Sequence, residues 1–337
     1  MPTRVAYLHA ALILTAAIAL SPVSAAAATQ RTFVASSGLD SNPCSVSAPC
    51  RSFGTAIANT LSGGELIVLD SAGYGPVTVT QTVSIVAPPG VYAGITVFLG
   101  NDGVTVNGSG IEVTLRGLTI SGQGGGTGIK FVLGSRLNIE NCLVTHMSLN
   151  ALSIDGGTSS QIYISDSTFR YSTANGIDIR TGIVTIDRVR LENNTGSGIF
   201  VGASSVTPVV VLVRDSVSSR NVNHGYTVNV GSPNIARLAV VRSAAHANGS
   251  FGAIAASTGG TAILSISGSE ILENQQGGVV STNAGATVTV SGSTISRNAN
   301  YGLQLFGAAV LTTLQNNTIE LNALGPANGT ITTSSVQ

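Results

Sequence analysis

The chain has 337 residues, of which only 9% are charged and 4% aromatic, and 15 basic residues balance 15 acidic ones. Lys130 is the only Lys, and no basic stripe is available for phosphate backbones or anionic membranes, so we expect no nucleic-acid partner. The 41 Gly residues, with abundant Val, Ile, Ser and Thr, are typical of many short strands joined by tight turns. A disordered chain would carry more charge.

Residues 1–27 have the pattern of a secretory signal peptide. Arg4 supplies the positive end, Ala10 to Leu20 form an apolar run, and Ala25 to Ala28 supply small residues for an A-x-A type of cleavage site. The apolar run is too short to span a bilayer, and no later segment is long enough. We therefore predict a secreted protein without a transmembrane segment, located outside the cell, in the periplasm or on the cell surface.

Residues 28–62 are predicted to form an N-terminal segment that ends in a capping helix. Ser52 can act as the N-cap of an amphipathic helix that reaches Leu61, and Gly63-Gly64 would stop it. A helix at this place would lie across the first coil of the following repeat. It would protect an exposed sheet edge that could otherwise pair with another chain.

Three cysteines follow the signal peptide. Cys44 and Cys50 lie in the loop before the helix, where an exported chain can oxidise them to a disulfide, and no His lies nearby to complete a metal site. Cys142 falls in a column of small inward residues, so we expect a buried free thiol there. The sequence therefore predicts one disulfide and no bound metal.

Residues 63–327 repeat one pattern about every 25 residues. In each unit one apolar residue follows another at a spacing of two, which indicates a strand with one buried face. The second residues of these pairs form an anchor column with separations of 22 to 27: Leu115, Ile139, Ile164, Ile186, Val213, Val240, Ile266, Val290 and Leu314. A second inward column follows five positions later, from Ile120 to Ile319.

Asn and Gly recur at the turns of each unit. The Asn column lies eight positions after the anchor and holds Asn194, Asn221, Asn248, Asn274, Asn298 and Asn322. The Gly column lies twelve positions after the anchor, just before a third apolar strand, and holds Gly176, Gly198, Gly225, Gly252, Gly278 and Gly302. We expect left-handed backbone at both columns, because Asn and Gly tolerate it best. We also expect hydrogen bonds between stacked Asn amides.

Three short strands per unit cannot bury their apolar faces alone. Stacking solves this, because each strand then pairs in parallel with its copy in the next coil. We therefore predict an all-β fold: a right-handed single-stranded parallel β-helix of about 9–11 coils with 22–27 residues each. A left-handed β-helix would show a stricter register than these separations. Residues 328–337 form a polar tail that we expect to leave the last coil irregularly.

The N-terminal segment resembles a known family. After Phe33 the chain contains a G-x-D-x-N-P turn at residues 38–43, and residues 49–57 fit the pattern P-x-x-[ST]-[FIL]-x-x-A-[IL]. The same turn and capping helix begin the exported bacterial pectate-lyase-like, right-handed parallel β-helix proteins. The resemblance covers nearly the whole mature chain and implies the fold. It implies no single function, because that superfamily holds lyases, hydrolases, epimerases and many non-enzymes.

Charged residues two positions after the anchor alternate in sign, from Asp166 and Arg188 to Asp215 and Arg242. Stacking would place each Asp beside an Arg in a surface ladder. Because pectate lyases hold calcium with clustered acids and use an Arg as base, the resemblance also implies a runner-up catalytic patch: Asp166, Asp178, Asp187, Arg188 and Arg190. We favour the structural ladder, since Arg side chains cancel the negative field that a calcium site needs. Calcium is expected only if the chain is a lyase.

Outward aromatic side chains give a candidate glycan contact. His224, Phe251 and Tyr301 precede the Gly column, and Phe200 and Phe306 should point outward from the third strand. Exposed rings along a regular face can stack on sugar rings, and a β-helix offers a long platform for a polymer. Alternatively, these rings pack under neighbouring turns.

No catalytic set of residues stands out, so we predict a non-enzyme. The predicted function is that of an exported scaffold, monomeric and without cofactor, that contacts extracellular or cell-envelope polysaccharide. Two alternatives stay open. The chain could be a polysaccharide lyase or glycoside hydrolase of the pectate-lyase-like superfamily, or it could be a protein-binding adhesin.

Overall fold

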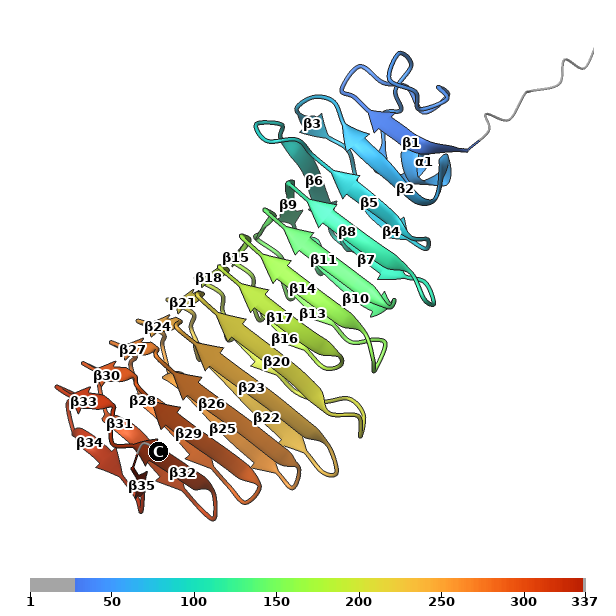
Figure 1. Ribbon diagram of the computed structural model, residues 1–337. Coiled ribbons are helices and arrows are strands. Elements are labelled where there is room, and N and C mark those ends of the chain that lie inside the picture. Colours follow the sequence, from blue (N-terminus) through green and yellow to red (C-terminus); the bar gives the residue numbers. More distant parts are fainter. Residues whose placement is uncertain (1–27, 336–337) are drawn as a thin grey trace, which may run out of the picture.

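The computed structural model describes residues 28–335 as a stack of three-stranded coils (Figure 1). The predicted signal peptide, residues 1–27, lies outside the described residues, as do residues 336–337. Each coil supplies one strand to each of three parallel sheets, so neighbouring strands in a sheet are one coil apart along the chain. The predicted all-β, right-handed parallel β-helix is confirmed.

Sheet A has 13 strands and contains the first strand of each coil. Its strands are β1 (Thr29–Val34), β2 (Thr60–Val68), β5 (Val83–Val86), β8 (Glu112–Arg116), β11 (Arg136–Glu140), β14 (Gln161–Ser165), β17 (Ile183–Asp187), β20 (Val209–Arg214), β23 (Ile235–Val241), β26 (Thr261–Ser267), β29 (Ala286–Ser291), β32 (Val310–Leu314) and β35 (Thr332–Ser334).

Sheets B and C have 11 strands each and contain the second and third strands of the coils. Sheet B is formed by β3 (Ala72–Gly73), β6 (Ala93–Phe98), β9 (Leu118–Gln123), β12 (Leu143–Thr145), β15 (Thr168–Arg170), β18 (Arg190–Glu192), β21 (Val217–Ser219), β24 (Ala244–His246), β27 (Glu270–Leu272), β30 (Thr294–Ser296) and β33 (Thr318–Glu320). Sheet C is formed by β4 (Val77–Val79), β7 (Val104–Asn107), β10 (Ile129–Leu133), β13 (Leu152–Ile154), β16 (Ile177–Ile179), β19 (Ile199–Val201), β22 (Tyr226–Gly231), β25 (Phe251–Thr258), β28 (Gly277–Thr282), β31 (Tyr301–Phe306) and β34 (Gly325–Asn328).

The predicted inward columns stack in register and form the core. The anchor residues pair coil by coil from Leu115 to Val290. The last predicted anchor, Leu314, is wrong by one residue, because Val290 pairs with Thr313. The cause is the turn after β32, which is one residue longer than the turn after β29. The second column pairs as predicted through to Ile319.

The Asn column forms a hydrogen-bonded ladder inside the stack, as predicted. From Asn194 to Asn298, each Nδ2 donates to Oδ1 of the Asn in the next coil at 2.8–3.0 Å. Each backbone N–H donates to the same oxygen at 3.0–3.1 Å. All six Asn side chains are buried. The ladder therefore satisfies polar groups that the coils could not otherwise bury.

The expectation of left-handed backbone at the Asn and Gly columns is wrong. Positive φ angles recur instead at the corner between sheets A and B and at the residue before each ladder Asn, such as Arg220 (53°) and Arg297 (54°). Crowding explains the Gly column: a Cβ at Gly252 would lie 2.3 Å from Cγ2 of Ile271 and 2.7 Å from Nδ2 of Asn274. Large side chains thus occupy corners that Gly would fit without strain.

Helix α1 (Phe53–Ala58) packs against β1, β2 and β4 at the N-terminal end of the stack (Figure 1). Ser52 is its N-cap, as predicted, and accepts a hydrogen bond from the Thr55 N–H. The helix is shorter than expected, because the chain from Thr60 onward pairs with β1. Leu61 therefore belongs to β2, where it is exposed.

Cysteine chemistry follows the prediction, whereas the C-terminal tail does not. Cys44 and Cys50 form a disulfide, and Cys142 is a buried free thiol whose pKa burial raises to about 11. The expected irregular tail is wrong, since β35 pairs with β32 and extends sheet A. Within residues 28–335, no helix has the length and apolar character needed to cross a membrane.

Candidate functional site

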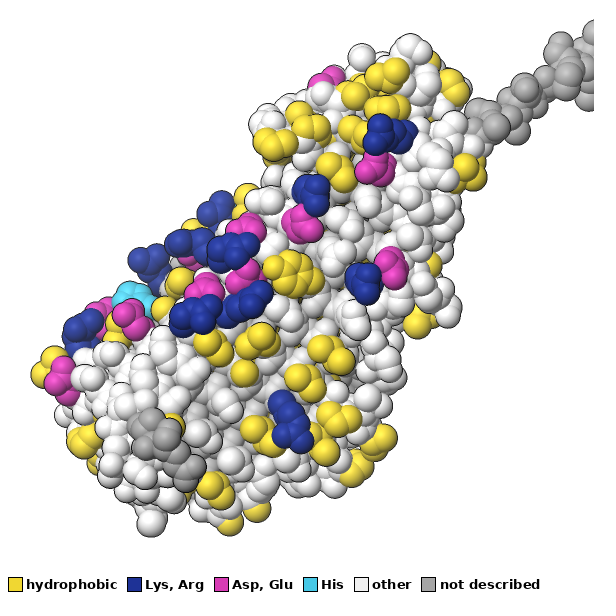
Figure 2. Space-filling view, viewed as in Figure 1, with side chains coloured by type: hydrophobic (Ala, Val, Ile, Leu, Met, Phe, Trp, Pro, Cys, Tyr) yellow, Lys and Arg dark blue, Asp and Glu magenta, His cyan; other side chains and the backbone are white. Residues whose placement is uncertain are grey.

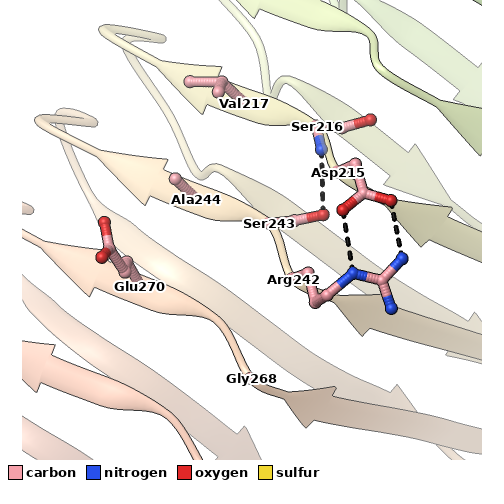
Figure 3. A pocket seen from close by; sticks show the side chains of 8 residues that line it. All are labelled: Asp215, Ser216, Val217, Arg242, Ser243, Ala244, Gly268 and Glu270. Carbon is pink, nitrogen blue, oxygen red and sulfur yellow. Dashed lines mark hydrogen bonds and ion pairs between the residues drawn. The ribbon is translucent and has the colours of Figure 1, made fainter.

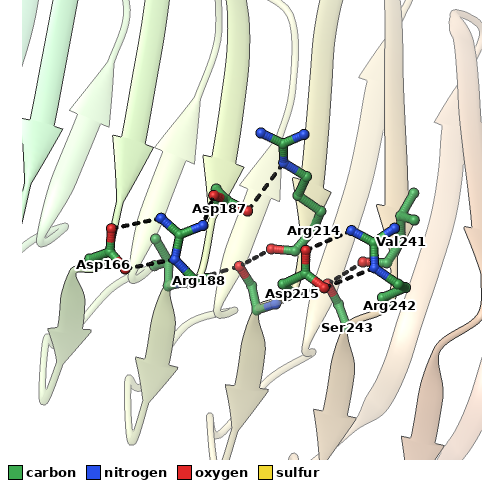
Figure 4. A network of polar contacts seen from close by, with 10 residues as sticks. Asp166, Asp187, Arg188, Arg214, Asp215, Val241, Arg242 and Ser243 are labelled. Carbon is green, nitrogen blue, oxygen red and sulfur yellow. Dashed lines mark hydrogen bonds and ion pairs between the residues drawn. The ribbon is translucent and has the colours of Figure 1, made fainter.

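Charged side chains gather along the edge where sheets A and B meet, while the outer face of sheet A carries mostly uncharged side chains (Figure 2). Arg188 lies at the centre of this edge. Its Nε and Nη2 donate to the two carboxylate oxygens of Asp166 at 2.7 and 2.8 Å, and its Nη1 contacts Asp187 (Figure 4). Asp187 is only 3% exposed and also accepts from Nε of Arg214 at 3.1 Å. The predicted ladder of alternating charges is confirmed for these coils.

Arg214 was not among the site residues predicted from the sequence. It ends β20, directly opposite Asp187 at the end of β17. The signal was present, because the two residues lie 27 positions apart, which is one of the coil separations found for the anchors. The repeat spacing therefore predicts the pairing of Arg214 with Asp187.

A second pair continues the ladder. Nε and Nη2 of Arg242 donate to the two oxygens of Asp215 at 2.9 and 2.7 Å. The hydrogen bond from Arg188 holds the pKa of Asp166 below its usual value, and that from Arg242 does the same for the pKa of Asp215. Both carboxyls are therefore fixed as anions. A general acid needs the opposite, a carboxyl that keeps its proton near neutral pH.

The charged corner column, formed by Asp166, Arg188, Asp215 and Arg242, has left-handed backbone at every position. Asp166, Arg188, Asp215 and Arg242 have φ angles of 50°, 52°, 50° and 45°. Left-handed backbone strains a residue other than Gly, whereas an exposed ion pair contributes little to stability. The next two coils place Gly at the same corner. The ion pairs Asp166–Arg188 and Asp215–Arg242 therefore lie on strained backbone that Gly would adopt with less strain.

The runner-up catalytic patch is only partly assembled. Asp166, Asp187 and Arg188 lie together, but Asp178 lies on β16 in sheet C, where Nη2 of Arg180 contacts its carboxylate at 3.1 Å. Arg190 lies on β18 and contacts Glu192. Guanidinium groups thus occupy the carboxylates that calcium would need, so the patch does not fit this ion. No three His, Cys, Asp or Glu side chains gather as metal ligands within residues 28–335.

His224, Phe251 and Tyr301 form a column at the corner between sheets B and C, which we call the ring column. It begins with a stacked pair. The rings of His224 and Phe251 are nearly parallel, with centroids 5.6 Å apart and planes 11° apart. The Phe251 N–H donates to Nδ1 of His224 at 3.2 Å. Burial lowers the pKa of His224 to about 4, so the ring is neutral at pH 7 and its proton is on Nε2. Within residues 28–335, Nε2 makes no hydrogen bond.

The other predicted rings differ in their exposure to solvent. Tyr301 continues the column two coils beyond Phe251 and is half-buried. Gly277 stands between them, and Gln304 fills the space at that coil, since a Cβ on Gly277 would lie 2.1 Å from its Nε2. Phe306 is 42% exposed. Phe200 is different, because the Arg180 guanidinium lies 4.5 Å from its ring centroid and covers one face. Of the five candidate rings, Phe306 is thus exposed, whereas Phe200, His224, Phe251 and Tyr301 are half-buried.

Comparisons with known proteins agree with this fold. The sequence model described as "Right handed beta helix region" matches residues 102–265. Pectate lyase Pel9A is similar in structure, with a TM-score of 0.55 and 18% identity over 87% of this chain and 80% of that chain. The A-module of mannuronan C-5 epimerase AlgE6 from Azotobacter vinelandii has a TM-score of 0.56 and 15% identity over 91% of this chain and 89% of that one.

The catalytic domain of a GH87 α-1,3-glucanase in complex with tetrasaccharides is also similar, with a TM-score of 0.52 and 11% identity over 91% of this chain and 68% of that chain. No curated protein matches the sequence. The chain thus has the right-handed parallel β-helix fold that its N-terminal segment and repeats predicted, and a pectate lyase is among the structures that share it. At these identities the likeness concerns the fold, which polysaccharide lyases, epimerases and glycoside hydrolases share.

The buried neutral His224 should make stability depend on pH. An unfolded His has a pKa near 6.5, whereas the folded value is about 4, so acid protonates the unfolded state first. Stability that is complete above pH 6.5 is then lost as the pH falls towards 4. We expect the free energy of unfolding to fall by about 1–2 kcal/mol between pH 7 and pH 5.

Urea unfolding followed by circular dichroism at the two pH values measures this loss. His224→Gln keeps an acceptor for the Phe251 N–H but does not titrate, so most of the loss should disappear in this variant. A pH dependence that is the same in wild type and variant would show that His224 is not held neutral by burial.

Proposed function

We propose that the protein is exported and binds a polysaccharide at the corner between sheets B and C without cleaving it. The observation that carries this proposal is the parallel stack of His224 on Phe251, in one column with Tyr301 along the axis of the coils. Phe306 lies on the same strand as Tyr301 and extends the aromatic surface across sheet C. In this proposal the protein acts as a monomer and binds the polysaccharide without a cofactor.

The chemistry of this corner suits an uncharged or weakly charged polymer. Aromatic faces contact the C–H faces of sugar rings, and the Nε2–H of the neutral His224 can donate to a hydroxyl. Two coils separate Phe251 from Tyr301, which is about 10 Å at the ordinary strand spacing. Each contact is weak, but a polymer that follows the stack gains from their repetition. A chain with no net charge offers little steering to strongly anionic polymers.

Three further observations support export and polysaccharide binding. The Cys44–Cys50 disulfide is typical of proteins in oxidising compartments outside the cytosol. Residues 1–27 have the pattern of a signal peptide. The similar solved structures include proteins named for their action on pectate, mannuronan and glucan. The absence of catalysis is proposed because Arg188 and Arg242 hold Asp166 and Asp215 as paired anions.

An enzyme acting on polysaccharide is the second candidate. One observation favours it: the carboxylate of Asp187 is 3% exposed and contacts both Arg188 and Arg214 on a β-helix surface. Two guanidinium groups beside one carboxylate could instead neutralise the carboxylate of an acidic sugar and stabilise the anion that forms when a base removes the neighbouring proton. A protein-binding adhesin that uses the same corner is the third candidate.

A glycan array probed with the mature chain tests the proposed function. We expect binding that the double variant Phe251→Ala/Tyr301→Ala loses, while its circular dichroism spectrum stays that of the wild type. Phe98→Ala is the matched control, because Phe98 is an exposed ring on β6, far from the column. Binding that is unaffected by the double variant would remove the corner as the site, and an array without any signal would favour the adhesin.

The same preparations decide between binding and catalysis. We expect neither unsaturated products by ultraviolet absorbance nor new reducing ends on pectate, alginate or polygalacturonate, with or without calcium. Turnover that disappears in Asp187→Ala or Arg188→Ala would establish the enzyme instead.

A further inference from the structure

A hollow of about 530 Å³ opens on the outer face of sheet B, beside the charged corner (Figure 3). Val217 on β21 and Ala244 on β24 are neighbours in register and form its apolar base. Asp215 and Arg242 line one side, and Glu270 on β27 lies at the end. This surface belongs to a different sheet from the ring column and shares no residue with it.

The hollow exists because the corner column changes from Arg242 to Gly268. Gly268 keeps the left-handed backbone with a φ of 56°, but it has no side chain to fill the space. A Cβ there would meet only Cγ of Arg242, at 3.6 Å. Charged side chains therefore occupy the corner only up to this coil, although Gly would meet the same backbone geometry with less strain.

Two polar groups of the hollow remain free for a ligand. Nε and Nη2 of Arg242 are engaged by Asp215, whereas Nη1 has no hydrogen bond in the described part of the chain. The Glu270 carboxylate has neither a hydrogen bond nor an ion pair within residues 28–335. The hydroxyl of Ser243 is not free, since it accepts from the Ser216 N–H and donates to the Val241 carbonyl.

The charges define which ligands fit. The lining holds two carboxylates, Asp215 and Glu270, and one guanidinium, Arg242. Arg188 and Arg214 act on Asp215 from outside the hollow, so the negative charge that stays uncompensated is that of Glu270. A sugar carboxylate would face this uncompensated charge. A hydroxyl or an ammonium group could donate to Glu270 and, as a hydroxyl, accept from Nη1 of Arg242. The C–H face of a ring would meanwhile cover Val217 and Ala244.

We propose that this hollow binds a pyranose unit of an uncharged or amino-sugar glycan and excludes uronate glycans. This second saccharide site goes beyond the ring column and does not depend on it. A polymer held at both sites would have to pass around the corner between sheets B and C. Separate oligosaccharides can occupy the two sites independently.

The test fills the hollow from its base. Ala244→Tyr places a strand-compatible ring over Val217, and Thr168→Tyr is the matched control, in the same row of sheet B three coils away. Both variants and the wild type are compared on an array of neutral, amino-sugar and uronate glycans, with titration calorimetry on the strongest ligand. We expect Ala244→Tyr to weaken neutral and amino-sugar binding about 10-fold or more, and Thr168→Tyr to change it less than about 2-fold.

Glu270→Gln tests the charge argument. It should leave binding of neutral glycans within about 3-fold but weaken binding of amino-sugar glycans about 10-fold. Uronate glycans as the tightest ligands, or ligands held equally by Ala244→Tyr and wild type, would overturn the inference. If Phe251→Ala/Tyr301→Ala abolishes binding while Ala244→Tyr has no effect, the hollow is not a binding site and the ring column is. Loss only in Ala244→Tyr would support the hollow and remove the ring column.

Discussion

Replacing Asn248 by Ala should lower the free energy of unfolding by about 3–5 kcal/mol. Its Oδ1 accepts from the N–H and from Nδ2 of Asn221, and its own Nδ2 donates to Ser218 O and to Oδ1 of Asn274. Asn248 and Asn221 are both buried, so water does not replace the lost partner. Each unsatisfied buried donor costs about 1–3 kcal/mol, and two donors of Asn221 lose their acceptor.

Urea unfolding followed by far-ultraviolet circular dichroism measures this change. Asn229→Ala is the matched control, because Asn229 is an exposed Asn on β22 of sheet C. Its stability should stay within about 0.5 kcal/mol of the wild type. A loss below about 1 kcal/mol in Asn248→Ala would mean that the ladder relaxes or hydrates around the gap, and the close packing of the coils would then be less strict than the structure indicates.

Gly252→Ala should cost about 3 kcal/mol, although it adds only one methyl group. The backbone at Gly252 is not left-handed, so the cost comes from crowding rather than from φ. The new Cβ would lie 2.3 Å from Cγ2 of Ile271, 2.7 Å from Nδ2 of Asn274 and 3.0 Å from Gly278 O. Relief requires the next coil to move away, which would stretch the hydrogen bonds of Asn274 and weaken the pairing of β25 with β28.

Gly54→Ala is a control with the opposite expected sign. Gly54 lies in helix α1, and no atom lies within 4 Å of the Cβ that Ala would add. Because Gly in a helix is less favourable than Ala, this variant should be more stable by about 0.5–1 kcal/mol. Equal stabilities of Gly252→Ala and wild type in the same unfolding measurement would contradict the crowding explanation of the Gly column.

The candidate sites were only partly predictable from the sequence. Residues that share a column, such as Asp166 with Arg188 or Asp215 with Arg242, were correctly placed together, because the repeat reveals which residues stack. Residues in different columns were not. Asp178 and Arg190 were grouped with Asp187, yet the three lie on sheets C, B and A. Around a coil, the direction of a side chain depends on corner angles that the spacing does not contain.

For the candidate rings too, contacts within a column were predictable and contacts between columns were not. The sequence placed His224, Phe251 and Tyr301 in one column, and the structure stacks the first two. It gave no sign that Arg180 would cover Phe200, because Arg180 lies at the end of the preceding strand of sheet C and reaches across to the next coil. Long side chains reach neighbours outside their own column, so their contacts depend on the conformation of the side chain and not on the register alone.

The sequence by itself determined the stacking of this protein. A parallel β-helix pairs each residue with its copy one coil later, so the apolar, Asn and Gly columns specify the contacts along the axis directly. Only the tertiary structure decided what happens around each coil. It placed the left-handed residues beside the Asn column rather than in it, ended helix α1 at Ala58 and opened the hollow at Gly268. These features depend on turn geometry and on the space between columns, which a periodic pattern does not encode.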